Sequence, residues 1–479
     1  MAVKGTNSRS AEDLLIELRR TDGAPLHRQI EGAIRDGIRS GRLPFGASLP
    51  PTRTVAADLG VSRGVVVEAY QQLVAEGYLT SRAGGYTQVA IGSEPVPVPV
   101  PAAAAVTKPD VDFGYGYADV AHFPRAAWLR SVRRVLTEAP NDRFGYPSGR
   151  GVPELREALA AYLNRVRGAA ARPEHLVICN GYAQGATLVV RALAAAGARR
   201  LAVEDPSSGD DAAVAAREFG LEVVGVPVDE DGVRVSALTD LDADALVLTP
   251  SHQWPTGAVL SAESRAAVLR WARERGAVVL EDDYDAEYRY DRAPIGAMQG
   301  LAPDLVAYAG SASKTLAPGM RLGWLALPGH LVEAVAAAKK AADRGSPALD
   351  QLTFADFLSH GEFDRHLRRM RPLYRRRRDV LLASLSARLP DFEPVGVAAG
   401  LHLVTWLPPG LAEEPLVTAA AAEGVRINGV GPYRRSPGRP GLIFGYAMLS
   451  EREIDEGVAV LAGVVNRQLR GSERATRGA

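Results

Sequence analysis

Apolar residues recur at helical spacing in the first part of the chain. Ile30, Ile34 and Ile38 fall four residues apart, which places them on one helix face before the glycine and proline of "SGRLPFG". A shorter helix is expected over 52–59, and after the turn "LGVS" another begins at Ser62, a residue type that caps helix N-termini. Two short helices joined in this way have the proportions of a helix-turn-helix, and "EGYLTSRAGGYTQVA" then predicts a strand, a glycine turn and a strand, which form a small wing. The residues expected to face the core of this module are Val55, Ala56, Leu59, Val66, Ala69, Tyr70 and Leu73.

After residue 110 the pattern changes. Apolar runs of strand length alternate with alanine-rich helical stretches, and the runs are continuous rather than alternating in polarity. Such strands indicate a sheet that is covered on both faces, so we expect an α/β fold with a mostly parallel sheet. The expected strands are "LVIC" (176–179), "LAVE" (201–204), "ALVLT" (245–249), "AVVLE" (277–281), "LVAYA" (305–309) and "LGWLAL" (322–327).

A proline-rich segment separates the two patterns. "GSEPVPVPVPAAAAVTKPD" (92–110) contains five prolines and no aromatic residue. Alternating Pro and Val favours extended polyproline II, which serves as a semi-rigid spacer. We therefore expect a winged helix-turn-helix module over 1–91, a linker over 92–109 and a larger domain over 110–479.

Composition narrows the class of protein. The chain has 479 residues, zero formal net charge and a single cysteine, so a disulfide framework and a thiolate metal cluster are both excluded. No apolar run approaches the roughly 18 residues that a membrane-spanning helix needs, so no membrane contact and a cytoplasmic location are expected. Residues 1–90 carry 11 Lys or Arg and 9 Asp or Glu, a net of +2. Any contact with nucleic acid must therefore come from the placement of charges rather than from their total.

The first turn of the second short helix is polar, as a recognition helix requires where it meets base edges and phosphates. Gly64 leaves room for close approach to a duplex, and Arg53 begins the preceding helix, where it is placed to neutralise a phosphate. Each of these residues alone is typical of a solvated surface. The residues expected to contact double-stranded DNA are Arg53, Ser62, Arg63, Gly64, Arg82 and Gly84.

"YAGSASKTLAPGMRLGW" (308–324) surrounds a lysine with hydroxyls. A lysine forms a Schiff base with an aldehyde only where a pocket holds the aldehyde and tunes the amine. Pyridoxal 5'-phosphate (PLP) also requires hydroxyls and a cation for its phosphate, and an acid for its ring nitrogen. Ser311 and Ser313 supply hydroxyls and Arg321 a cation, so Lys314 is the candidate Schiff-base lysine.

Three further segments follow expected strands and point to the same sheet edge, where ligands of open α/β sheets bind. "LEDDYDAEYRY" (280–290) places Asp282 to protonate a ring nitrogen and Tyr284 to bond a ring oxygen. Alone, this stretch is also compatible with a solvated acidic turn or a metal site; because no histidine accompanies it in the sequence, no metal is predicted. "TPSHQWPTG" (249–257) offers polar groups including His252. "CNGYAQGA" opens a helix whose free N–H groups suit a phosphate, at Tyr182, Ala183 and Gln184.

These motifs carry two resemblances. Residues 24–90, with "PLHRQI", "SGRLPFGASLPPTR", "LGVSR" and "AYQQLVAEGYL", resemble the winged helix-turn-helix of GntR-family transcription regulators, although the wing has "AGGYTQV" where that family usually has G-S-G-T. Residues 110–468 resemble a fold-type I aminotransferase domain through "HFPRAAW", "GYPSGRGVPELREALAAYL", "VEDP", "PSHQWPTG", "LEDDYDAEY" and "SASKTLAPGMRLG". Together they resemble the MocR/PdxR subfamily. The resemblance implies that Lys314 carries PLP, that Asp282 and Tyr284 hold its ring, and that Tyr146 reaches the cofactor of the partner in a head-to-tail homodimer.

The chain departs from this pattern at two places. Where the family usually has Gly-Tyr after "VEDP", the chain has Ser207 and Ser208, so no tyrosine is there to stack on the ring. Ile443 in "GLIFGYAML" stands where aminotransferases carry the arginine that clamps the substrate carboxylate. Arginines that lie close in sequence are Arg434, Arg435 and Arg439.

Three functions follow from these observations. The sequence favours a DNA-binding regulator whose second domain senses PLP or a PLP–amino acid adduct, with control of vitamin B6 or amino-acid metabolism as a hypothesis. An active aminotransferase with a vestigial DNA-binding head is the alternative. A scaffold that has lost the cofactor is the third.

Overall fold

The structure is a computed structural model that describes residues 14, 16–20, 23–81, 86–91, 109–207, 210–290 and 295–477. The chain forms two compact units, Met1–Val106 and Thr107–Ala479. The division falls inside the segment predicted as a linker.

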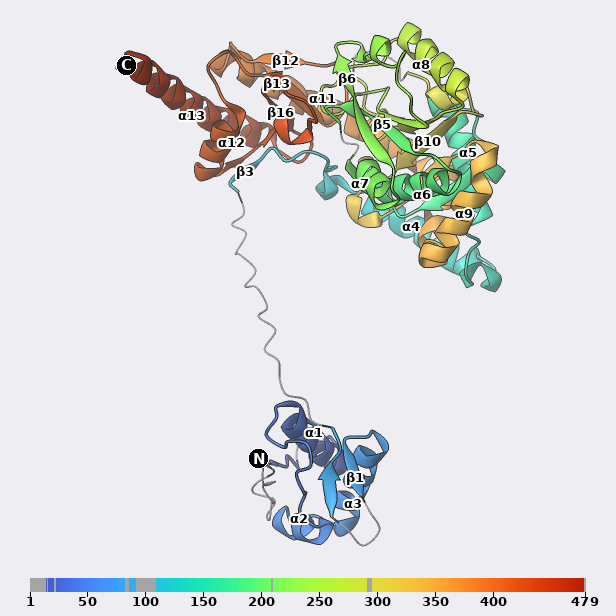
Figure 1. Cartoon of the computed structure of the whole chain (residues 1–479), viewed down its shortest axis with the longest axis vertical. Coiled ribbons are helices and arrows are strands. Elements are labelled where there is room, and N and C mark those ends of the chain that lie inside the picture. The colour runs from blue at the N-terminus through green and yellow to red at the C-terminus, as the bar shows by residue number, and fades with distance from the viewer. Residues whose placement is uncertain are drawn as a thin grey trace. The chain divides into compact units, whose positions relative to one another are not determined.

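The first unit is a small helical domain with a two-stranded wing (Figure 1). Ile30, Ile34 and Ile38 are buried on one face of the first helix, as their spacing predicts. The residues predicted to face the core are buried, except Leu59, which is half-buried. The wing strands pair antiparallel, with Leu79 opposite Val89, while Arg82 and Gly84 lie outside the described residues. The elements are α1 Leu26–Arg39, α2 Thr52–Asp58, α3 Arg63–Ala75, β1 Leu79–Ser81 and β2 Thr87–Val89.

In the described part of the second unit, eight strands form one sheet in the order β4-β11-β10-β9-β8-β5-β6-β7. The central strands β10, β9, β8, β5 and β6 run parallel to one another, while β11 runs antiparallel to both of its neighbours. All six strands expected from the sequence are present. The strands are β4 Leu176–Cys179, β5 Arg200–Asp205, β6 Glu222–Asp229, β7 Gly232–Val233, β8 Ala245–Leu248, β9 Val278–Asp282, β10 Val306–Ser311 and β11 Gly323–Ala326.

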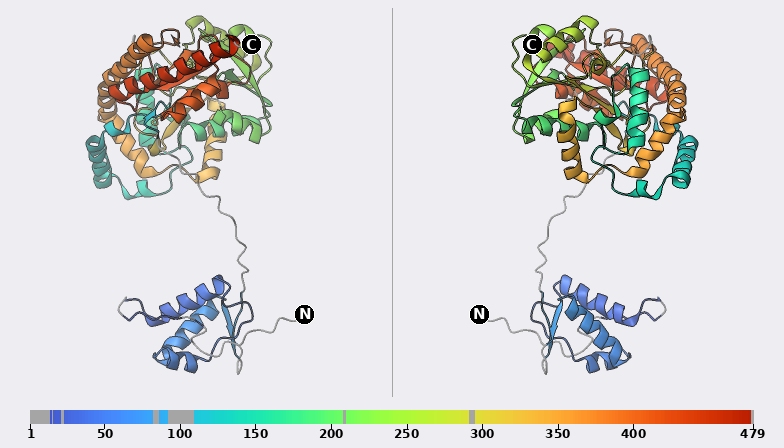
Figure 2. Two further views of the ribbon diagram at one scale, coloured as in Figure 1. Left: turned by 90° about the vertical axis from the view of Figure 1, so that its left-hand side faces the viewer. Right: turned by 90° about the vertical axis from the view of Figure 1, so that its right-hand side faces the viewer.

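Helices cover both faces of this sheet, which explains the continuous apolar runs (Figures 1 and 2). In β9, Val278 and Leu280 pack into the core under helices α6, α7 and α9, whereas Val279 packs into the core under α8. Both faces are therefore buried, and the prediction of an α/β fold with a mostly parallel sheet is confirmed. These helices are α6 Tyr182–Ala195, α7 Asp210–Glu218, α8 Ala262–Arg275 and α9 Gly329–Asp343.

A second, antiparallel sheet in the order β12-β13-β16-β15 lies near the end of the chain. Its strands, which were not predicted, span two to five residues: β12 Glu393–Val395, β13 His402–Trp406, β15 Asn428–Gly429 and β16 Gly441–Gly445. A two-residue parallel pair, β3 Val111–Asp112 with β14 Val425–Arg426, is a separate small sheet of the same unit. The remaining helices are α4 Arg125–Glu138, α5 Pro153–Arg167, α10 Ala348–Ser359, α11 Glu362–Arg388, α12 Glu413–Ala422 and α13 Glu451–Arg477. Among the described helices, none combines the length and apolarity that crossing a bilayer would need.

Candidate cofactor site

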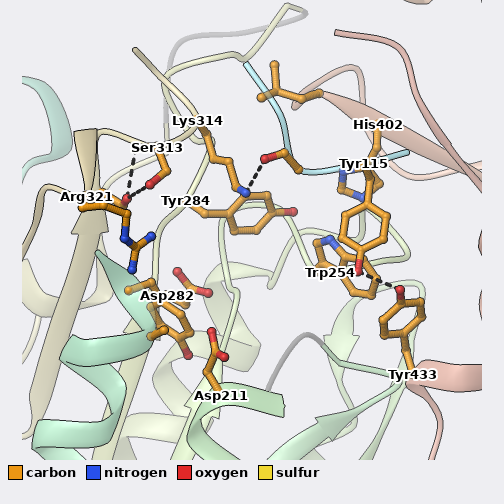
Figure 3. A pocket seen from close by; sticks show the side chains of 15 residues that line it. Tyr115, Asp211, Trp254, Asp282, Tyr284, Ser313, Lys314, Arg321, His402 and Tyr433 are labelled. Carbon is orange, nitrogen blue, oxygen red and sulfur yellow. Dashed lines mark hydrogen bonds between the residues drawn. The ribbon is translucent and has the colours of Figure 1, made fainter. Parts of the chain in front are cut away.

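A cavity of about 360 Å³ opens where β9 and β10 end and α6 begins. Asp282 is the last residue of β9 and Ser311 the last of β10, so the topology brings both to this edge. Lys314 lies at the centre, with Arg321 to one side and a group of aromatic side chains to the other (Figure 3). The lining residues are Tyr115, Gly116, Tyr182, Ala183, Asp211, Trp254, Asp282, Tyr284, Ser311, Ser313, Lys314, Arg321, Leu401, His402 and Tyr433.

The Lys314 amine is held by one backbone contact. Its Nζ donates a hydrogen bond of 2.5 Å to the carbonyl oxygen of Gly116. Gly116 has φ +87°, and a Cβ there would lie 3.0 Å from Nζ, so glycine allows this approach. Burial lowers the pKa of Lys314, against the opposing charge of Asp282. A larger fraction of the amine is therefore neutral and nucleophilic than for an exposed lysine.

One end of the cavity gathers anion-binding groups. Ser311 Oγ donates to Ser313 Oγ at 2.9 Å, and Arg321 donates through Nη2 to the carbonyl of Asn180 at 2.6 Å. A Cβ on Gly181 would lie 3.2 Å from the Arg321 guanidinium, so the glycine that precedes α6 leaves space for it. The first N–H groups of α6 have no carbonyl partner within the helix, since residues at a helix N-terminus precede the first turn. Hydroxyls, a guanidinium and a helix N-terminus thus meet here.

Asp282 is a buried acid without a neutralising partner among the described residues. Burial and the neighbouring Asp283 raise its pKa well above the usual range for a carboxyl group, although Lys314 partly offsets this. No described residue donates a hydrogen bond to its carboxylate. A cationic or proton-donating ligand group at this point would relieve the unfavourable burial of the charge.

The other acids of the "LEDDYDAEYRY" segment are buried and have partners, so it is not a solvated turn. Asp283 pairs with Arg167, whose Nε lies 2.7 Å from Oδ2, and it also accepts from Tyr308 Oη at 2.7 Å. Burial disfavours the charge of Arg167, but Asp283 nevertheless holds the pKa of Arg167 above its usual value. The remaining contacts are those of Glu281 with the N–H groups of Met298 and Gln299, of Asp285 with His252, and of Glu287 with Tyr162.

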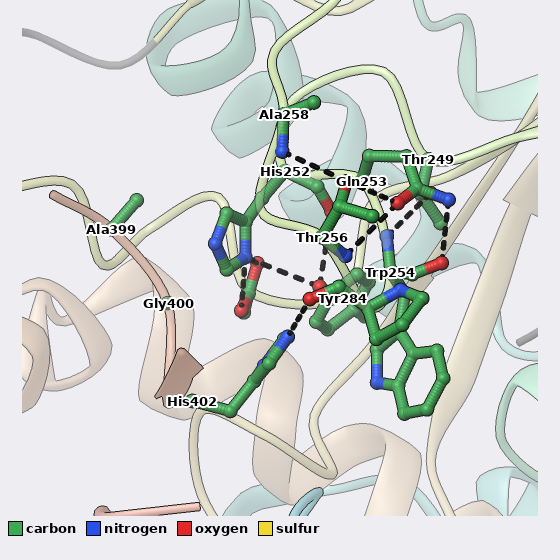
Figure 4. Close-up of polar contacts among 12 residues, drawn as sticks. Thr249, His252, Gln253, Trp254, Thr256, Ala258, Tyr284, Ala399, Gly400 and His402 are labelled. Carbon is green, nitrogen blue, oxygen red and sulfur yellow. Dashed lines mark hydrogen bonds and ion pairs between the residues drawn. The ribbon is translucent and has the colours of Figure 1, made fainter. Parts of the chain in front are cut away.

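No histidine lies within this acidic segment in the sequence, and we therefore expected none beside it. In the folded chain this expectation is wrong. His252 and His402, which come from other segments of the chain (Figure 4), both lie beside Asp285. His252 donates from Nδ1 to Asp285 Oδ2 at 3.0 Å, and His402 donates from Nε2 to the Pro255 carbonyl at 3.1 Å. Each ring therefore already uses one nitrogen within the protein.

Tyr284 links this polar cluster to the cavity. Its hydroxyl donates to the carbonyl of His252 at 3.0 Å, and its side chain lines the cavity. His252 itself is not among the lining residues and lies behind Tyr284. The structure therefore places His252 where it orients Tyr284, and not where the sequence prediction of direct cofactor contact would have it.

The other predicted cofactor-binding residues divide into two groups. Lys314, Asp282, Tyr284, Ser311, Ser313, Arg321, Tyr182 and Ala183 line the cavity. Gln184 and Tyr146 do not. The Gln184 side chain accepts from the Asn180 N–H at 2.8 Å and donates to Asp343 at 2.8 Å, while Tyr146 is 88% exposed. The binding roles of all these residues stay predictions.

Sequence reasoning missed much of the lining: Tyr115, Gly116, Asp211, Trp254, Leu401, His402 and Tyr433. Trp254 lies within the "TPSHQWPTG" segment, but only the polar groups of that segment were predicted to lie at the site. Tyr433 immediately precedes Arg434 and Arg435, two of the three arginines that lie close to Ile443 in sequence. The others lie outside the recognised motifs, and no local signal identifies them.

Ile443, at the position of the missing arginine, is fully buried in an apolar cluster with Trp254, Val404 and Val430. None of the three neighbouring arginines lines the cavity. Arg434 and Arg439 both lie over the ring of Trp406, and the backbone N–H of Arg435 donates to Asp205. At the other departure, the Ser207 N–H donates to the Tyr433 carbonyl at 3.2 Å, while Ser208 lies outside the described residues.

In the first unit, four of the predicted DNA-contacting residues are exposed at the start of the two short helices. Arg53 lies in the first turn of α2, Ser62 is the N-cap of α3, and Arg63 and Gly64 begin α3. The turn between α2 and α3 thus presents polar and cationic groups outward.

Comparison with known proteins agrees with both halves of this description. The model of the family "Aminotransferase class I and II" matches residues 110–461, and that of "Bacterial regulatory proteins, gntR family" matches residues 26–89. The chain is 33% identical to a probable rhizopine catabolism regulatory protein, MocR, of Rhizobium meliloti, over 93% of this chain and 94% of that protein. It is 30% identical to the pyridoxine biosynthesis transcriptional regulator PdxR of Corynebacterium glutamicum, over 95% of this chain and 99% of that protein.

Solved structures match the larger unit. An archaeal alanine:glyoxylate aminotransferase is 27% identical, with a TM-score of 0.69 over 76% of this chain and 92% of that one. The α-aminoadipate aminotransferase LysN of Thermus thermophilus is 28% identical, with a TM-score of 0.68 over 75% of this chain and 93% of that one.

Proposed function

The chain belongs to the MocR/PdxR-type regulators, in which a GntR helix-turn-helix is joined to an aminotransferase class I and II domain, and from this premise we propose that it senses PLP and converts occupancy of the cavity into a change in DNA binding. The observation that carries the proposal is the meeting of Lys314, Asp282 and the Ser311–Ser313–Arg321 group in one cavity.

The residues present fit PLP. When bound, PLP would supply an aldehyde, which the neutral amine of Lys314 would hold. The lowered pKa of Lys314 suits that amine, and the unpaired acid Asp282 suits a protonated ring nitrogen. The Tyr182 hydroxyl is buried without a hydrogen-bond partner among the described residues, as expected of a group that awaits a ligand. Ser311, Ser313 and Arg321 would hold the phosphate, and Tyr284 the ring oxygen.

Regulation requires that a ligand favour one of two arrangements of the protein. We infer that the chain acts as a head-to-tail homodimer, with the exposed Tyr146 reaching the partner's cavity, and that cavity occupancy biases how two helix-turn-helix modules engage an operator. Arg53, Ser62, Arg63 and Gly64 would contact that DNA. The relative named for pyridoxine biosynthesis supports vitamin B6 genes as a target. Such a regulator acts where the cell keeps its DNA, in the cytoplasm.

The test is an absorption spectrum of the full chain with added PLP, followed by titration of DNA from upstream of its own gene. Wild type should show a near-visible band and a PLP-dependent change in DNA affinity, and Lys314→Ala should lose both. Lys340→Ala, at an exposed position on α9, is the matched control and should behave as wild type. A band with unchanged DNA affinity would contradict PLP sensing. Absence of a band would contradict PLP binding, and would favour a scaffold that has lost its cofactor.

An active aminotransferase is the second candidate, because the solved relatives carry that name and the lysine and its cradle are present here. The buried Ile443 argues against it, since no described cationic side chain takes the place of the carboxylate clamp. Steady conversion of an amino donor and a keto acid by the purified full chain would establish this function instead.

A further inference from the structure

The end of the cavity away from Arg321 has an aromatic wall, which we define as Tyr115, Trp254 and Tyr433 (Figure 3). The Trp254 ring lies 4.6 Å from that of Tyr115 and 4.5 Å from that of Tyr433, centroid to centroid. A hydrogen bond of 2.7 Å from Tyr115 Oη to Tyr433 Oη joins the other two. These contacts fix the three rings as one surface.

This wall lies next to the amine of Lys314. Gly116, whose carbonyl accepts from Lys314 Nζ, directly follows Tyr115 in the chain. A ligand that reaches the Lys314 amine from this side must therefore pass along the aromatic wall. An amino group there finds a carbonyl acceptor, and an apolar substituent finds rings.

The aromatic wall itself contains no charged side chain. Within the described part of the chain, the charged side chains that line the cavity are Asp211, Asp282, Lys314 and Arg321. None belongs to the aromatic wall. His402, which also lines this side, is kept neutral, because burial lowers its pKa to about 3. The buried Ile443 belongs to the same apolar cluster as Trp254.

A carboxylate at the aromatic wall would lose its hydration without gaining a bidentate partner, and it would share the cavity with two acids. An uncharged aromatic group loses nothing comparable. We propose that the cavity, beyond PLP, admits a primary amine that carries an aromatic or apolar group and no α-carboxylate. This inference rests on the proposed function and specifies the class of its second ligand.

The experiment compares 2-phenylethylamine with L-phenylalanine, which differ only by the carboxylate. Each is titrated into the PLP-loaded full chain, and its dissociation constant is read from the near-visible band and from the shift in DNA affinity. We expect L-phenylalanine to bind roughly tenfold to a hundredfold more weakly, as for a polar group left without its partner. In Ile443→Arg the difference should vanish or reverse. Ile443→Met, the matched apolar control, should keep the wild-type order.

Because Ile443→Arg introduces a charge into a core, its melting temperature is compared with that of wild type before titration. If it does not fold, Tyr433→Leu replaces it, and this variant should weaken 2-phenylethylamine while PLP uptake persists. Tighter binding of L-phenylalanine by wild type would overturn the inference and would indicate a cation from a partner subunit. Failure of both probes to bind would overturn it as well, leaving PLP as the sole ligand. Absence of the PLP band itself would instead overturn the proposed function.

Discussion

The two ends of the cavity differ in the residues that line them, and Lys314 lies between the two. Near Arg321, strand ends, a helix N-terminus and hydroxyls supply fixed charges and dipoles, and the buried ion pair of Arg167 with Asp283 lies behind them. Near Tyr433, loops and a short 3-10 helix supply the rings, and His402, the first residue of β13, supplies a neutral imidazole. The charged end corresponds to motifs that are readable in the sequence, whereas the aromatic end is assembled from segments far apart. The first end suits a constant cofactor and the second a variable ligand, which is where members of one family can diverge.

The largest expected effect lies behind the charged end. Arg167→Met leaves Asp283 buried without its cation, and removing one member of a buried pair destabilises a protein by roughly 3–5 kcal/mol. Urea unfolding followed by tryptophan fluorescence is the measurement, since all five tryptophans lie in the second unit.

The matched substitution at the aromatic end is Ile443→Val, which removes one buried methylene and should cost only about 0.5–1.5 kcal/mol. The double variant Arg167→Met/Asp283→Leu should recover part of the loss, because no buried charge is then left unpaired. Equal effects of the two single variants would contradict the view that only one end depends on buried charge.

The stability of the folded chain should fall at low pH because of His402. Burial lowers the pKa of His402 to about 3 in the folded chain, whereas an unfolded histidine titrates near 6.5. The unfolded state then binds more protons at low pH, so stability is lost as pH falls below about 6.5 and continues to fall toward 3. Between pH 6.5 and 5, wild type should lose about 1.5 kcal/mol more than His402→Gln.

His366 provides the comparison for this pH effect. Burial lowers its pKa to about 4, and its Nε2 donates to the Thr315 carbonyl at 2.9 Å, next to Lys314. The difference between wild type and His366→Gln should have the same sign but stop growing below about pH 4. Superimposable pH profiles of wild type and His402→Gln would mean that His402 is not held neutral by the fold.

The sequence predicts those residues of the site that lie close together in the chain better than those that distant segments bring together. Lys314, Ser311 and Ser313 share one short segment, and Asp282 ends an apolar strand, so local pattern identified them. The parallel sheet was predictable because its strands are apolar on both faces. The second sheet was not predicted, and its strands span only two to five residues. The aromatic wall joins Tyr115 to Tyr433 across most of the second unit.

The sequence also did not predict the direction in which side chains point. His252 lies in a predicted segment, yet its side chain bonds Asp285 rather than lines the cavity. The direction in which a side chain points depends on partners that other segments supply, so residue type and position alone cannot give it.

The smallest expected effect belongs to a hydroxyl at the start of α6. Tyr182 Oη is buried without a hydrogen-bond partner in the described part of the chain, so Tyr182→Phe removes an unsatisfied polar group and should raise the stability of the ligand-free chain by about 1 kcal/mol. Tyr162→Phe is the control of opposite sign, because the Tyr162 hydroxyl donates to Glu287 at 3.3 Å and its loss should destabilise. With PLP added, the order at position 182 should reverse, since a ligand that fills the cavity can supply the missing partner. If Tyr182→Phe were stabilised by PLP as much as wild type, the hydroxyl would have no part in holding a ligand, and the fit of PLP to this end would rest on the lysine, the acid and the phosphate-binding groups alone.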